Sequence, residues 1–158
     1  MDVVLERANI EDAQAILNLQ VLAYQQEAAI YNNYAIPPLL QSLQSLQEEF
    51  QTHTFLVARL DREIIGAVRA VCRDGRCHIA RLIVHPSRQR HGLGAQLLAA
   101  IEAAFPEALH FELFTGHRSE GNLRLYRRLG YREFKHEPAA PGLQIVFLEK
   151  PNKPLPAP

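Results

Sequence analysis

One segment in the middle of the chain could bind an anion. A run of branched apolar residues, Arg76 to Val84, leads into Val84-His85-Pro86-Ser87-Arg88-Gln89-Arg90-His91-Gly92-Leu93-Gly94-Ala95. Apolar residues then recur at helical spacing, which predicts a strand, a glycine loop and the start of a helix. Unpaired backbone N–H groups at a helix start attract anions, and Gly92 and Gly94 would let a phosphate approach the backbone closely. The alternative is that both glycines only shape the turn.

Two other phosphate-binding loops do not fit this segment. The dinucleotide-binding pattern requires a third glycine where Leu97 stands, and the nucleotide-triphosphate loop requires Gly-Lys followed by Ser or Thr, which this chain lacks. Arg88 and Arg90 place positive charge beside the glycines, although 17 Lys and Arg balance 17 Asp and Glu over the whole chain. The sequence therefore predicts a local anion site without a generally basic surface.

A second group of candidate residues lies further along the chain. Asn122 and Tyr126 stand four residues apart in a predicted helix, so they share one face of it. Gly130 follows the helix at the position where a glycine commonly ends one, and Tyr131 comes next. The alternative for Tyr126 is a core aromatic residue of an amphipathic helix.

Together these segments resemble a known family. Gln89 to Gly94 resembles the Gln/Arg-x-x-Gly-x-Gly/Ala signature of the GNAT superfamily of acyl-coenzyme A-dependent N-acetyltransferases, and Asn122 to Tyr131 resembles its second conserved block. The resemblance extends from Val3 to Glu149 and implies a coenzyme A pyrophosphate site on the backbone of the glycine loop. It also implies that a strand backbone holds the pantetheine arm. The implied coenzyme-binding residues are Leu82, Ile83, Val84, Gln89, Arg90, His91, Gly92, Leu93, Gly94, Ala95, Asn122 and Tyr126.

The resemblance implies transfer of an acetyl group from acetyl-coenzyme A directly to a primary amine, without a metal. A phenol with a pKa of about 10 is protonated at neutral pH, so Tyr126 is the candidate general acid for the departing thiolate. Glu112 is the candidate base, with Glu27, His78 and His117 as further candidates. The candidate acceptor-binding residues are Glu27, Tyr31, Tyr34, Arg81 and His117. Arg81 could bind an acceptor carboxylate or cap the sheet.

Other activities stay open at this point. A coenzyme A-binding or sensing module could keep the glycine loop without turnover. An acetyltransferase could instead act on a protein N-terminus or on lysine, although we expect a small-molecule amine. The balanced charge disfavours nucleic acid as a partner, and no apolar run is long enough for a membrane span, so we expect a cytoplasmic protein. An edge strand could also pair two copies into a homodimer.

The elements that must position these residues follow from periodicity and turn residues. The predicted order is strand, two helices, three strands, helix, strand, helix, two strands, which is an α+β fold with a mostly antiparallel sheet of about seven strands, a splayed strand pair and four helices. The predicted strands are Val3 to Arg7, Thr54 to Leu60, Glu63 to Val71, Arg76 to Val84, Leu109 to Thr115, Tyr131 to Lys135 and Leu143 to Glu149. The predicted helices begin near Ile10, Pro37, Leu93 and Glu120, the second of them reaching Phe50.

The length and the cysteines complete the expectations. A chain of 158 residues suits one domain, which we place at 1–150, with a loose proline-rich tail at 151–158. Cys72 and Cys77 flank an Asp-Gly turn and could face each other across a hairpin. Two cysteines do not make a disulfide framework, so we expect both to be thiols.

Overall fold

The computed structural model describes residues 2–152 and contains one seven-stranded sheet with the strand order β1-β2-β3-β4-β5-β7-β6. Neighbouring strands are antiparallel except β4 and β5, which are parallel. The strands are β1 (Val3–Arg7), β2 (Thr54–Leu60), β3 (Glu63–Arg73), β4 (Arg76–Val84), β5 (His110–Gly116), β6 (Arg132–Ala140) and β7 (Leu143–Pro151). This arrangement confirms the predicted α+β fold.

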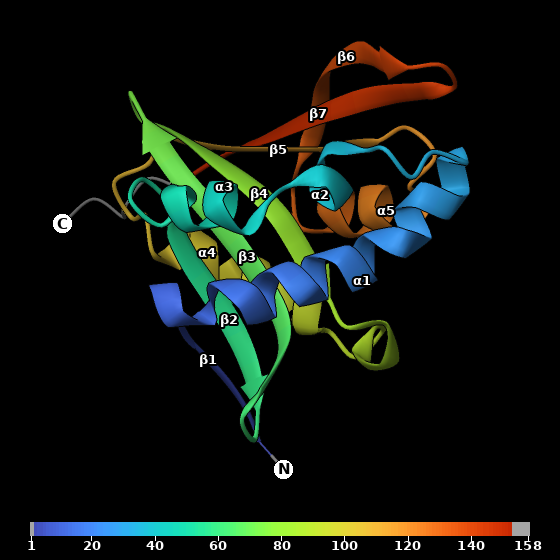
Figure 1. Ribbon diagram of the computed structural model, residues 1–158. Coiled ribbons are helices and arrows are strands. Elements are labelled where there is room, and N and C mark those ends of the chain that lie inside the picture. The colour runs from blue at the N-terminus through green and yellow to red at the C-terminus, as the bar shows by residue number, and fades with distance from the viewer. Residues whose placement is uncertain (1, 153–158) are drawn as a thin grey trace, which may run out of the picture.

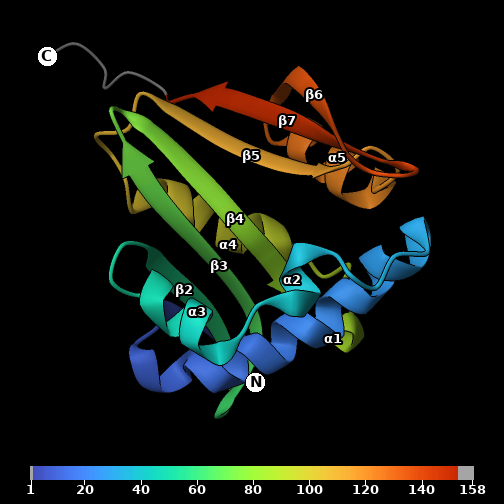
Figure 2. The ribbon, with the colours of Figure 1, turned by 45° about the horizontal axis from the view of Figure 1, so that its top comes forward.

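Helices cover both faces of the sheet (Figures 1 and 2). On one face lie α1 (Ala13–Tyr31), α2 (Pro37–Leu40) and α3 (Leu43–Glu49), and on the other lie α4 (Leu93–Ala103) and α5 (Glu120–Arg128). Ile16 and Leu19 of α1 pack in one apolar cluster with residues of β2 and β3, whereas Leu97 and Ile101 of α4 are fully buried in the other. The apolar residues that recur along each helix therefore form the face that packs against the sheet.

The predicted second helix is divided into α2 and α3. Gln41 leaves helical geometry with φ −65° and ψ 130°, and Ser42 starts α3 by accepting a hydrogen bond from the Ser45 N–H group. The break lets the Gln41 side chain reach inward, where its Oε1 accepts hydrogen bonds from Gln20 and Arg69, each at 3.0 Å. The spacing of the leucines predicted one helix, because apolar residues recur at helical intervals on both sides of the two-residue break.

Strands β4 and β5 diverge along their length (Figure 2). Only Arg76–His78 of β4 pair with His110–Glu112 of β5, although β4 continues to Val84 and β5 to Gly116. The backbone polar groups on the facing sides of both strands are therefore open to an extended ligand that adds to the sheet. This divergence is the predicted splayed pair.

A β-bulge interrupts β4 inside the diverging part. Ala67 pairs with Ile83 and Arg69 pairs with Ala80, so one residue of β3 lies opposite both Arg81 and Leu82. Arg81 has a φ of 52°, in the left-handed region that a side chain rarely occupies. The extra residue reverses the alternation of β4, so that Ile79 packs toward α4 and Ile83 toward α1. The sequence did not predict this bulge.

The last two strands, β6 and β7, extend beyond their predicted ends. β6 continues past Lys135 to Ala140 and includes Pro138, which an edge strand tolerates because one side of it makes no ladder bonds. Residues 151 and 152 belong to the folded domain instead of the predicted tail, because Pro151 ends β7 and the Asn152 N–H group donates to the Leu109 carbonyl at 2.9 Å. Residues 153–158 lie outside the described part. None of the helices within 2–152 is long and apolar enough to cross a membrane.

Candidate active site

The glycine loop lies at the end of β4 and leads into α4. Gly92 is the N-cap of α4 with a φ of 80°, and Arg90 is also left-handed with a φ of 68°. The Gln89 side chain donates to the Val84 carbonyl at 3.2 Å, which ties the loop to the strand end. The His85 Nδ1 atom accepts the Ser87 N–H group at 3.1 Å. These contacts fix the turn that starts the helix.

The start of α4 suits an anion. The Gln96 N–H group bonds the Gly92 carbonyl at 3.1 Å, so the N–H groups of Leu93, Gly94 and Ala95 precede the first intrahelical bond and point out of the helix end. A Cβ atom at Gly92 would meet nothing within 4 Å, which means that the space in front of these donors is open. Unpaired N–H groups at a helix start favour an anion, and the phosphate site at this loop stays a prediction.

Tyr126 lies on α5 and is 5% exposed. Burial is the main reason that its pKa is raised, and the negative charge of Glu27 and the nearby Tyr24 raise it further. The phenol consequently stays protonated at neutral pH. Within residues 2–152 its hydroxyl group makes no hydrogen bond, so the proton is available to a ligand.

Two donors from the start of α5 hold the Glu27 carboxylate in place. The Ser119 hydroxyl donates to Oε2, and the Asn122 amide donates to Oε1 at 3.4 Å. Asn122 also donates to the Thr115 hydroxyl at 3.1 Å, near the end of β5. Both donors are neutral, so no cation among residues 2–152 pairs with Glu27.

Tyr31 ties the C-terminal end of α1 to the same region. Its hydroxyl lies 2.8 Å from the Ser119 hydroxyl and accepts the Arg118 N–H group at 2.9 Å. A Cβ atom at Gly116 would lie 2.0 Å from the Tyr31 hydroxyl oxygen, so any other residue there would displace the Tyr31 side chain. Sequence reasoning named Tyr31 but missed Gly116 and Ser119, because only the folded chain brings residues so distant in sequence together.

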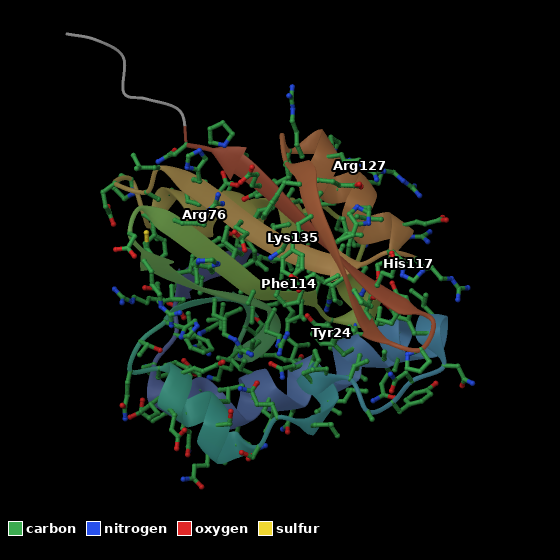
Figure 3. The ribbon with its side chains drawn as sticks, turned by 90° about the horizontal axis from the view of Figure 1, so that it is seen from above. Tyr24, Arg76, Phe114, His117, Arg127 and Lys135 are labelled. Atoms are coloured by element: carbon green, nitrogen blue, oxygen red, sulfur yellow. The ribbon has the colours of Figure 1, made fainter. Side chains whose placement is uncertain are left out.

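Two arginines lie between the sheet and α1. Arg69 is 2% exposed, and its Nε lies 3.0 Å from a Glu49 carboxylate oxygen. Burial lowers the Arg69 pKa to about 10. Arg81 projects from the bulge, and its guanidinium carbon lies 6.0 Å from the centre of the Tyr24 ring. Figure 3 shows Tyr24 between α1 and the strands. The sequence prediction placed Tyr24 on the apolar core stripe of the first helix and gave it no role in the site.

The other predicted site residues lie at the edges of this region. Glu112 lies where β4 and β5 still pair, and its carboxylate contacts Arg76 at 3.2 Å and His78 at 3.5 Å. The His117 Nδ1 atom accepts the Gln144 N–H group at 3.0 Å, and Tyr34 is 55% exposed between α1 and α2. Their roles stay predictions. Within residues 2–152, no three His, Cys, Asp or Glu side chains are grouped to hold a metal ion.

The chain is similar to solved acetyltransferase structures along nearly its whole length. The ribosomal-protein-S18-alanine N-acetyltransferase of Escherichia coli superposes with a TM-score of 0.80 at 15% identity, covering 98% of this chain and 97% of that one. The PaiA N-acetyltransferase of Thermoplasma acidophilum, solved with coenzyme A, gives 0.79 at 18%, covering 96% and 99%. YncA of Salmonella typhimurium, solved with its cofactor acetyl-CoA, gives 0.75 at 19%, covering 100% and 98%. At these identities the likeness shows the shared fold.

Sequence comparison gives the family. The protein YqkA of Bacillus subtilis (strain 168), designated UPF0157, is 28% identical over 142 residues, which are 89% of this chain and 41% of that protein. The chain thus spans less than half the length of that relative. The family model described as "Acetyltransferase (GNAT) domain" matches residues 19–150, which include the glycine loop, the diverging strands and Tyr126. The chain therefore belongs to the GNAT acetyltransferase family.

Proposed function

We propose that the protein transfers an acetyl group from acetyl-coenzyme A to the primary amine of a small acceptor. The observation that carries this proposal is that β4 and β5 separate beyond Arg76–His78, while the start of α4 follows the end of β4 and the buried, protonated Tyr126 shares an apolar cluster with Leu93 of α4. Family membership supports it, as do similar folds solved with coenzyme A and acetyl-CoA. No step requires a metal.

The coenzyme would lie along the open part of β4. The N–H groups at the start of α4 would hold its pyrophosphate, with Arg88 and Arg90 adding positive charge. The backbone groups of Leu82, Ile83 and Val84, which lie beyond the last β4–β5 pair, would hold the pantetheine arm in the manner of an added strand. When bound, acetyl-coenzyme A supplies the thioester that the amine attacks.

Proton transfer falls to two side chains, Tyr126 of α5 and Glu27, which the start of α5 holds through Ser119 and Asn122. As the N–C bond forms and the C–S bond breaks, Tyr126 donates its proton to the sulfur and Glu27 accepts a proton from the amine. The proton on Glu27 then passes to the Tyr126 phenolate, which restores both groups. We favour Glu27 over Glu112 as the base because the charge of Glu27 acts on Tyr126, whereas Arg76 and His78 engage Glu112.

Tyr126→Phe tests the general acid. Release of free thiol from acetyl-coenzyme A is followed with a panel of primary amines, and we expect kcat to fall at least about 100-fold because the proton donor is lost. The coenzyme Kd from calorimetric titration should stay the same. Tyr131→Phe is the matched control, because it removes the same atom from another buried tyrosine, whose hydroxyl donates to Glu102 and has no proposed role in the site. A Tyr126→Phe rate within twofold of the wild type would reject this role.

A pH profile of kcat/KM tests the assignment of Glu27 as the base. If Glu27 takes the amine proton, we expect kcat/KM of the wild type to fall toward acid pH, and this fall should be reduced in Glu27→Gln, which can still accept the Ser119 hydrogen bond. Glu112→Gln should keep the wild-type profile, and the reverse pattern would transfer the role to Glu112. Tight coenzyme binding without thiol release from any amine would favour a coenzyme-sensing module instead.

A further inference from the structure

Arg81 is a partly buried cation without an anionic partner. Within residues 2–152 it forms no ion pair, and its Nε atom is buried without a hydrogen-bond partner. The buried Gln20 Oε1 atom is also unpartnered and lines the same hollow as Arg81. The hollow has no room for a water molecule, so Nε stays without a partner there and the positive charge stays unpaired. Such a charge is costly to keep away from water unless an anion joins it.

The neighbouring groups do not neutralise Arg81. Glu49 is the nearby carboxylate on this side of the sheet, and it is paired with Arg69, whose second partner is Gln41. Tyr24 contributes only a ring face and a hydroxyl group, and burial raises its pKa, so it is neutral. The guanidinium of Arg81 therefore keeps donors for a ligand, in a fork that matches the two oxygens of a carboxylate.

Glu27 carries a charge of opposite sign on the same helix as Tyr24. Tyr24 and Glu27 are three residues apart on α1, so they share one helix face, and the charges of both Arg81 and Glu27 act on the Tyr24 hydroxyl. Glu27 receives hydrogen bonds only from the neutral groups of Ser119 and Asn122 among the described residues. The site thus presents one uncompensated cation and one uncompensated anion, and both act on the Tyr24 hydroxyl.

We propose that Arg81 binds a carboxylate of the acceptor, so that the acceptor is a small amino acid whose amine lies toward Glu27. This inference rests on the proposed acetyl transfer and narrows its substrate class. A zwitterion neutralises both side chains at once, whereas a simple amine leaves Arg81 unpaired. The bulge in β4 gives Arg81 this position. In regular strand geometry residue 81 would lie on the same sheet face as Ile79, which packs toward α4.

The test compares each of the twenty standard amino acids with its carboxamide, which keeps the amine and loses the carboxylate charge. Calorimetric titration into the protein saturated with coenzyme A measures binding, and thiol release from acetyl-coenzyme A measures turnover. We expect the wild type to prefer at least one amino acid over its amide by about 100-fold in kcat/KM. In Arg81→Gln this preference should fall to within about threefold, with an unchanged coenzyme Kd.

Two further variants keep the result interpretable. Arg81→Lys keeps the charge and should retain part of the preference, whereas Arg73→Gln removes a charge at an exposed position of β3 and should match the wild type. The proposal is overturned if amides bind as well as acids, if no amino acid binds, or if Arg81→Gln keeps the preference. Failure of acetyl transfer itself appears differently, as amino acid binding that depends on Arg81 without thiol release.

Discussion

The glycine loop offers the sharpest test of coenzyme binding, because one position separates backbone strain from charge. Gly92 has a φ of 80°, so any side chain there costs roughly 1–2 kcal/mol of folding free energy. A Cβ atom would nevertheless meet nothing within 4 Å. Gly92→Ala should therefore fold with reduced stability and place only a methyl group in front of the helix start, while Gly92→Glu adds a negative charge to the same strain.

The charge sets the size of the expected effect. A carboxylate about 5 Å from a phosphate charge, at an effective dielectric constant of about 20, is repelled by roughly 3 kcal/mol. That free energy corresponds to about a 100-fold increase in Kd. Gly92→Glu should thus bind coenzyme A about 100-fold more weakly than Gly92→Ala, whatever the strain that both variants share.

Calorimetric titration of coenzyme A into the wild type and both variants measures this ratio, with circular dichroism to establish that each is folded. Raising the salt concentration should narrow the gap between the two variants, because salt screens exposed charges. Equal Kd values for Gly92→Ala and Gly92→Glu would refute the reasoning. The two glycines would then be turn formers, and the coenzyme would need another anchor.

Two further outcomes concern the scaffold around the site. Gly116→Ala should displace Tyr31 and lose its two hydrogen bonds, lowering stability by about 2 kcal/mol and the Tm by several degrees. Gly121→Ala, whose added Cβ has open space, should keep the wild-type Tm, and equal melting of both variants would contradict the Tyr31 contact. Cys77 is buried with its pKa raised to about 12, mainly by that burial, so iodoacetamide at pH about 8 should modify Cys72 alone. Mass spectrometry that finds native Cys77 labelled first would contradict its burial.

The features that sequence predicted well are local or periodic. The order of the elements followed from apolar spacing, and the glycine loop was recognisable because Gly92 and Gly94 stand at the joint between a strand and a helix. Asn122 and Tyr126 lie on one helix as expected, and Asn122 contacts Thr115 at the end of β5. Each of these depends on residues close together in the chain.

The features that sequence missed depend on contacts between distant segments. Tyr24 gave no signal beyond a place on an apolar helical stripe, yet it lies against Arg81, 57 residues away by their numbers. Ser119 precedes α5 and resembles an ordinary helix start, but its hydroxyl is bound to Glu27 and Tyr31 of α1. The break at Gln41 is likewise explained by Gln20 and Arg69, which receive its side chain.

The bulge in β4 explains both the position of Ile83 and the contact between Arg81 and Tyr24. Without the extra residue, the alternation of β4 would continue unchanged, and Ile83 would lie on the α4 face with Ile79 instead of packing against α1. With it, Arg81 reaches Tyr24 while the strand still ends at the glycine loop. The left-handed backbone of Arg81 costs roughly 1–3 kcal/mol of folding free energy. A binding role for Arg81 would explain why the chain keeps this conformation where the two strands diverge. Deleting Arg81 would remove the bulge and return Ile83 to the opposite face, which is a larger change than any substitution at that position.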